Sequence, residues 1–200
     1  MNDAESRKWL RRAAEQGAAL AQDNLGLILA EENDPEALRW FQKAATQGLL
    51  SAQRHLGNIY YNGNNGIPRD YAKAFYWLQK AAEQNDAWAQ NLLGVMYQNA
   101  QGGPPDPALA MIWFEKAAEQ GNAKAQSNLG QMYFAGKGIE TDPVEGYRWL
   151  VLSIEQNEIT AEKFLGEYKA GMTPGEIAAG QTLVEEYKRK RLSSPAPDKP

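Results

Sequence analysis

Residues 113–121 read Trp-Phe-Glu-Lys-Ala-Ala-Glu-Gln-Gly, and variants of this stretch occur five times in the chain. The other copies begin at Trp9, Trp40, Trp77 and Trp149. Successive tryptophans lie 31, 37, 36 and 36 residues apart, and four aspartates (Asp34, Asp70, Asp106 and Asp142) recur every 36 residues. A fixed period of this size is typical of stacked-repeat proteins, in which each unit contacts only its neighbours.

A second motif, Ala-x-x-x-Leu-Gly, alternates with the tryptophan motif at residues 21–26, 52–57, 89–94, 125–130 and, as a variant, 161–166. We number positions from its alanine, so that leucine is at position 5, glycine at position 6 and a recurring tyrosine at position 9. Positions 1, 5 and 9 share one helical face, which we expect to be buried. Glycine inside a helix costs about 1 kcal/mol relative to alanine. Its recurrence therefore predicts a close approach between two paired helices, with Ala pairs such as 81–82 and 117–118 facing the glycine.

Turn and capping residues mark the helix boundaries. Asp34-Pro35, Asp106-Pro107 and Asp142-Pro143, together with Asp70, predict the start of the second helix in each pair. Thr173-Pro-Gly-Glu176 has the pattern of a capping box. It predicts a last helix over about residues 174–190, with Ile177, Val184 and Tyr187 facing the repeats.

We therefore expect one repeat array over residues 3–190. Residues 3–17 correspond to the second helix of an incomplete first unit, and residues 160–190 to a degenerate repeat with a cap helix. The repeats between them are 20–48, 51–85, 88–121 and 124–157. Residues 193–200 contain three prolines and no large apolar side chain, so a disordered tail is expected.

Bulk composition excludes several classes of protein. The net charge is −4 at pH 7, which argues against a nucleic-acid partner because such proteins present a basic surface. No apolar run is long enough to span a membrane, and no cysteine is present for a disulfide or a thiolate metal site. The first residues lack the apolar core of a signal peptide. Cytoplasm is the default expectation, with the periplasm or secretion as the alternative if a preceding segment exists.

Together these motifs resemble the Sel-one-like repeat family, a relative of the tetratricopeptide repeats. The pattern runs Ala-x-x-x-Leu-Gly-x-x-Tyr, then a glycine-rich loop, then Asp-x-x-x-Ala-x-x-Trp-x-x-Lys-Ala-Ala-x-x-Gly, and it covers roughly residues 3–190. The resemblance implies an all-α fold, a right-handed superhelical solenoid of antiparallel helix pairs. It also implies a protein-binding adaptor or scaffold whose concave face is lined by the first helix of each pair.

Positions 0, 3, 7 and 10 of the first helices lie opposite the expected buried face and are candidate partner contacts. They include Arg54, Asn58, Tyr61, Trp88, Asn91, Val95, Lys124, Ser127, Gln131 and Phe134. Trp88 is the only tryptophan outside the repeated motif, and tryptophan is favoured at interface hot spots. It could instead fill a gap between repeats. Arg54, Asn91 and Lys124 could bind a peptide carboxylate or could simply be solvated.

Nothing in the sequence indicates catalysis, and we expect no cofactor and no metal. His55 is the only histidine, and no nucleophile motif accompanies it; we expect it at the surface or at the edge of a groove. The five motif tryptophans are expected in the core. An adaptor of this kind should be a monomer. The alternative is a self-assembling module that uses the Trp9 helix, and the basic run 188–191 offers only weak attraction to an anionic membrane.

Overall fold

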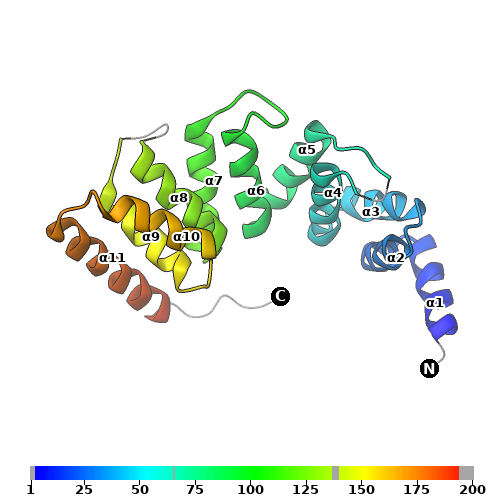
Figure 1. Cartoon of the computed structure of the whole chain (residues 1–200). Helices are drawn as coiled ribbons and strands as arrows, with labels where there is room; N and C mark the ends of the chain where they lie inside the picture. The colour runs from blue at the N-terminus through cyan, green and yellow to red at the C-terminus, as the bar shows by residue number, and fades with distance from the viewer. Residues whose placement is uncertain (1–2, 65, 137–139, 194–200) are drawn as a thin grey trace. The chain divides into compact units, whose positions relative to one another are not determined.

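The computed structural model describes residues 3–64, 66–136 and 140–193, and every regular element in these ranges is an α-helix (Figure 1). The chain divides into two compact units, residues 1–105 and 106–200. Unit 1 contains α1 (Asp3–Glu15), α2 (Ala19–Glu31), α3 (Glu36–Thr46), α4 (Leu50–Asn62), α5 (Tyr71–Glu83) and α6 (Ala87–Gln98). Unit 2 contains α7 (Pro107–Glu119), α8 (Ala123–Ala135), α9 (Pro143–Ile154), α10 (Ile159–Lys169) and α11 (Pro174–Ser193). The expected all-α repeat fold is confirmed, whereas the extent of a single array stays a prediction.

The second helices begin where the aspartates predict. Asp70, Asp106 and Asp142 are N-caps whose carboxylates accept hydrogen bonds from backbone amides in the first turns of α5, α7 and α9. In the first repeat Pro35 occupies the N-cap, and Asp34 Oδ1 accepts a hydrogen bond from Glu36 N at 2.8 Å. Each carboxylate satisfies backbone donors that the helix itself leaves unpaired.

Three of the position 6 glycines, Gly26, Gly57 and Gly130, allow paired helices to touch, as predicted, but their nearest neighbours are not the Ala pairs. A Cβ on Gly57 would lie 2.6 Å from Leu78 Cδ2, and one on Gly26 would lie 2.8 Å from the Phe41 ring. Gly130 has the same relation to Leu150. The glycine therefore faces the residue that follows the motif tryptophan, and that residue is completely or almost completely buried in all three pairs.

The expectation that all five motif tryptophans are core residues is wrong. Trp40 and Trp149 are buried, Trp77 and Trp113 are half-buried, and Trp9 is 59% exposed. The motif alone does not set the exposure, because Phe41 and Leu78 pack in the same way against a glycine although Trp40 is buried and Trp77 is half-buried. The lysine three residues later lies over the indole in two copies: Lys43 Nζ lies 4.0 Å from the Trp40 ring centroid, and Lys116 Nζ lies 4.4 Å from that of Trp113.

Buried glutamines connect consecutive helices. Gln22, Gln53, Gln90 and Gln126, all at position 2, are between 1% and 4% exposed. Each donates a hydrogen bond to the carbonyl of the second alanine in the preceding Ala pair, at 3.0–3.2 Å. Three of them also accept a 2.7 Å hydrogen bond from the glutamine that follows their own repeat's second helix: Gln47, Gln84 and Gln156. These paired amides explain why glutamine recurs both at position 2 of the first helices and directly after the second helices.

The last helix is held by its predicted capping box. Thr173 N donates to Glu176 Oε2 at 2.7 Å, and Glu176 N donates to Thr173 Oγ1 at 3.2 Å. Val184 is buried and Tyr187 is half-buried, as expected for the inward face. The helix continues to Ser193, which the sequence had placed in the tail. The rest of that predicted tail, 194–200, lies outside the described residues.

Candidate partner-binding site

A cavity of about 370 Å³ in unit 1 is lined by Arg54, His55 and Asn58 of α4 and by Trp88 of α6. Arg54 and Asn58 are four residues apart, so both project from one face of α4. Trp88 lies in the first turn of α6, directly after the N-cap residue Asp86 and Ala87. The cavity therefore joins an arginine, an imidazole, an amide and an indole on two consecutive first helices.

Arg54 is held beside the cavity by the cap of α6. Its Nη1 lies 3.4 Å from Asp86 Oδ2, while Oδ1 of the same carboxylate accepts a 2.7 Å hydrogen bond from Ala89 N. A charge-assisted hydrogen bond is ordinarily shorter than 3.4 Å. The contact with Asp86 therefore orients the guanidinium without engaging all of its five donors.

His55 is fixed by a carboxylate below the cavity. Asp23 is 2% exposed, and its Oδ1 lies 3.0 Å from His55 Nδ1, while its Oδ2 accepts a 2.6 Å hydrogen bond from Ser51 Oγ. Burial by itself raises the pKa of the Asp23 carboxyl, but the hydrogen bonds from His55 and Ser51 outweigh it and hold that pKa below its ordinary value. The ionised carboxylate accepts a hydrogen bond from Nδ1–H, which leaves Nε2 as the other polar atom of the ring.

The three polar groups do not form a catalytic triad. In a triad the histidine lies between the serine and the carboxylate, so that it can take the serine proton. Here Asp23 lies between the other two, and Ser51 donates to it. Because Ser51 donates to Asp23, the imidazole is not placed to take the serine proton, and the three groups form a structural brace under the cavity.

Asn58 presents a donor to the cavity. Its Oδ1 accepts a 2.7 Å hydrogen bond from Asn62 Nδ2, one turn further along α4. Because the amide oxygen is engaged in this way, Nδ2 is the group left to donate to a ligand. The cavity thus offers donors from Arg54 and Asn58 beside the aromatic surface of Trp88.

The structure brings three of the ten predicted contact residues together here: Arg54, Asn58 and Trp88. It places Asn91 and Ser127 in the interior, with exposures of 8% and 2%, so the expectation that they face solvent is wrong. Position 3 of α2 abuts position 0 of α4, as the Asp23–Ser51 hydrogen bond shows. The short Asp23 side chain is covered there, whereas the long Arg54 side chain at the same position of α4 is exposed.

The other predicted residues occupy varied environments. Tyr61 is half-buried and packs against Tyr71 with ring centroids 5.6 Å apart, and Phe134 stacks on Tyr168 at 4.4 Å. Val95 and Gln131 are half-buried, and Lys124 is exposed. Their role in binding stays a prediction. Sequence reasoning placed His55 at the surface or at the edge of a groove. Its spacing of three residues from Asn58 on the same helix was a signal that the two share a face.

The described residues contain no group of three or more histidine and acidic side chains placed to hold a metal ion. No helix in the same part of the chain is both long and apolar enough to cross a membrane.

Comparison with known proteins supports the repeat assignment. The Sel1 repeat family matches residues 2–17, 19–49, 50–86, 89–122 and 123–158. A Sel1 repeat protein from Oxalobacter formigenes is similar in structure, with a TM-score of 0.71 and 33% identity over 83% of this chain and 49% of its own. The protective antigen c5321 of uropathogenic Escherichia coli, which displays an SLR fold, gives a TM-score of 0.55 and 26% identity over 100% of this chain and 54% of its own.

This chain thus spans about half the length of these two proteins. No curated protein matches its sequence. The recurring Leu-Gly and Trp-Lys-Ala-Ala motifs, the helix pairs that they build and the five matched segments all agree, and the chain belongs to the Sel1 repeat family.

Proposed function

We propose that this chain is a non-enzymatic adaptor that binds a peptide segment of a partner protein in the cavity of Arg54, His55, Asn58 and Trp88. Sel1 repeats are generally protein–protein interaction modules. The observation that carries the finer proposal is the meeting of Arg54 and Trp88 in one cavity of about 370 Å³. Arginine and tryptophan are the residue types most enriched at interface hot spots.

The polar groups of the cavity favour a carboxylate as the ligand. Arg54 and Asn58 supply donors, and the acidic groups nearby are already engaged: Asp23 by His55 and Ser51, and Asp86 by the α6 backbone and Arg54. A carboxylate that approaches Arg54 gains charge-assisted hydrogen bonds. An adjoining apolar side chain of the peptide would pack on the Trp88 ring, so the preferred segment combines an acidic group with an apolar residue.

The test is selection of peptides from a random library on the intact chain, followed by titration of the enriched peptide. We expect Trp88→Ala and Arg54→Gln each to weaken binding by about fivefold or more, a cost above about 1 kcal/mol that only a minority of interface residues reach. Leu20→Ala is the matched control, because Leu20 occupies the same position 0 on α2 and is 63% exposed. Enriched peptides that bind all three variants equally would refute the site.

A self-assembling module is the second candidate, and the exposure of Trp9 favours it. The indole is 59% exposed, and the guanidinium of Arg12 lies 5.6 Å from the ring centroid. End-to-end association would bury this ring against another chain. Sedimentation at increasing concentration distinguishes the two: an adaptor stays monomeric, whereas assembly appears in the wild type and is lost in Trp9→Ala.

A further inference from the structure

In unit 2, α11 fills a groove between two helices. The groove at the equivalent repeat position in unit 1 is left open by the described residues of that unit. In unit 2 the groove lies between α7 and α9, the second helices of consecutive repeats. Tyr187 Oη donates to the carbonyls of Ala118 and Glu119 at the end of α7, at 3.1 and 3.2 Å. Its ring packs edge-on against Trp149 of α9, with centroids 5.6 Å apart.

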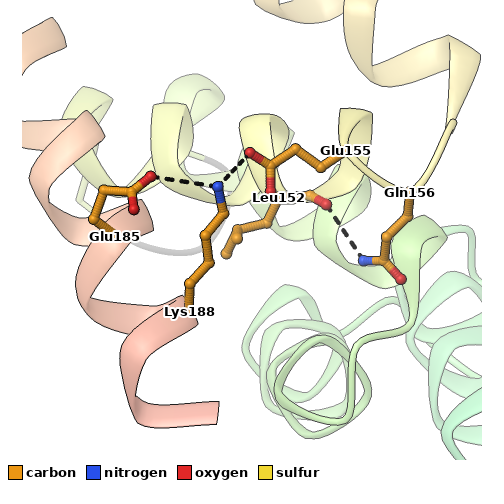
Figure 2. Close-up of polar contacts among 5 residues, drawn as sticks. All are labelled: Leu152, Glu155, Gln156, Glu185 and Lys188. Atoms are coloured by element: carbon orange, nitrogen blue, oxygen red, sulfur yellow. Dashed lines mark hydrogen bonds and ion pairs between the residues drawn. The ribbon is translucent and has the colours of Figure 1, made fainter. Parts of the chain in front are cut away.

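Two basic residues complete this contact. Arg191 Nη2 donates to Gln120 O at 3.4 Å, and the guanidinium lies against Gly121. Lys188 Nζ reaches from α11 to Glu155 at the end of α9, at 2.6 Å, and also contacts Glu185 at 3.3 Å (Figure 2). The carbonyls at the end of a helix carry partial negative charge, which suits hydroxyl and guanidinium donors.

In unit 1 the corresponding groove lies between α3 and α5. It holds a cavity of about 190 Å³ whose lining includes Ala45, Thr46, Gly48, Gln53, Tyr76 and Trp77. When the repeats are aligned on their motif tryptophans, Trp77 is equivalent to Trp149. The residues equivalent to Ala118, Glu119 and Gly121 are Ala45, Thr46 and Gly48. The backbone carbonyls and the indole that hold Tyr187 and Arg191 therefore have counterparts here.

The outer edge of this groove is more aromatic than its counterpart. Tyr76 takes the place of Arg148 and is 53% exposed, and its ring lies 4.9 Å from that of Trp77 in an edge-on arrangement. Lys80, in the place of Leu152, lies 5.0 Å above the Tyr76 ring. An exposed aromatic beside helix-terminal acceptors is suited to a partner that brings its own aromatic ring and hydroxyl.

We propose that the α3/α5 groove is a second docking surface, and that it takes an amphipathic helix of a partner protein carrying a tyrosine and, four residues later, an arginine. The tyrosine hydroxyl donates to the carbonyls of Ala45 and Thr46 beside Trp77. The arginine contacts the turn at Gln47 and Gly48. Within unit 2 the corresponding contacts come from Tyr187 and Arg191 of α11, the last helix in Figure 1.

The test uses a labelled synthetic peptide with the sequence of residues 174–193, titrated by fluorescence anisotropy against the full chain. We expect saturable binding that is weakened roughly tenfold by Tyr76→Ala in the chain and by Tyr187→Phe or Arg191→Gln in the peptide. Ile112→Ala is the control in the chain, because Ile112 occupies the same register on α7 and is 44% exposed. Thermal unfolding of each variant verifies that its fold is unchanged.

Three outcomes overturn the proposal. The first is the absence of saturable binding to the wild-type chain. The second is binding that Tyr76→Ala does not change, since the peptide would then be exchanging with α11 in unit 2. The third is self-association of the full chain that both Tyr76→Ala and Tyr187→Phe abolish, which would identify the occupant as α11 of a second copy.

Discussion

The side-chain amide of Gln84 donates a 2.7 Å hydrogen bond to Oε1 of Gln53, and Gln53 Nε2 in turn donates to Ala45 O at 3.2 Å. Three helices, α3, α4 and α5, are linked in this way through one glutamine that is 4% exposed. The buried Gln53 amide depends on protein partners, whereas Gln84 is exposed and reaches it from the end of α5. The pair therefore ties helix to helix through a satisfied buried polar group.

Replacing Gln53 with alanine removes both hydrogen bonds and leaves a buried carbonyl with one donor fewer. We expect a loss of about 1–3 kcal/mol in the free energy of unfolding, measured by urea denaturation. Gln181→Ala on the exposed side of α11 is the control and should change stability by less than about 0.5 kcal/mol. Equal effects in the two variants would refute a structural role for the glutamine pair.

Replacing either of two glycines at the same repeat position with alanine should change the stability in opposite directions. At Gly57 a Cβ would lie 2.6–2.7 Å from the buried Leu78 side chain, whereas at Gly166 on α10 no atom lies within 4 Å. Gly57→Ala should destabilise the chain by about 1–3 kcal/mol through overpacking. Gly166→Ala should stabilise it by about 0.5–1 kcal/mol through helix propensity. Thermal unfolding of both variants measures the signs, and the same sign at both positions would contradict close helix contact at Gly57.

Lowering the pH should remove the contribution of Asp23 to the free energy of unfolding. Its pKa is lower in the folded chain than its ordinary value of 3.8, because the hydrogen bonds from His55 and Ser51 outweigh the effect of burial. The stabilisation is therefore complete above the unfolded pKa and is lost as the pH falls through the folded pKa. We expect the difference in unfolding free energy between wild type and Asp23→Asn to stay constant from about pH 7 to 5 and to shrink below about pH 4. A difference that grows on acidification would contradict this assignment.

Glu115 should show the opposite dependence. Burial raises the pKa of this carboxyl, and the charge of Glu119 adds to the rise, although Tyr133 Oη donates to it at 3.4 Å. Because the folded state binds the proton more tightly, stability decreases as the pH rises from the ordinary value of 4.5 through the folded pKa. Glu115→Gln should therefore gain stability relative to the wild type at neutral pH, and the gain should vanish below about pH 4. Chemical denaturation across this range measures it.

The sequence predicted the helix pairs, the aspartate caps and the capping box of α11 because each depends on local chemistry at a fixed register. It failed where a neighbouring helix decides the environment. Trp9 and Trp77 share a motif with Trp40 but differ in exposure, since the helices packed around each one differ.

The same limit applied to the candidate site. Helical spacing put Arg54 and Asn91 on one outward face, but only the structure shows that the shorter Asn91 side chain is buried while Arg54 is exposed. The sequence shows that glutamine recurs at position 2, but it does not show which group each glutamine bonds to. The hydrogen bonds to the Ala-pair carbonyls supply that explanation.

The most direct test of the binding proposal is the indole N–H spectrum of the ¹⁵N-tryptophan-labelled chain during titration with a selected acidic peptide. The Trp88 signal is assigned by its loss in Trp88→Phe. The account predicts that this signal shifts in a saturable manner, while that of the buried Trp40, 6% exposed, stays in place. A Trp88 signal that stays fixed while another tryptophan signal shifts to saturation would contradict it.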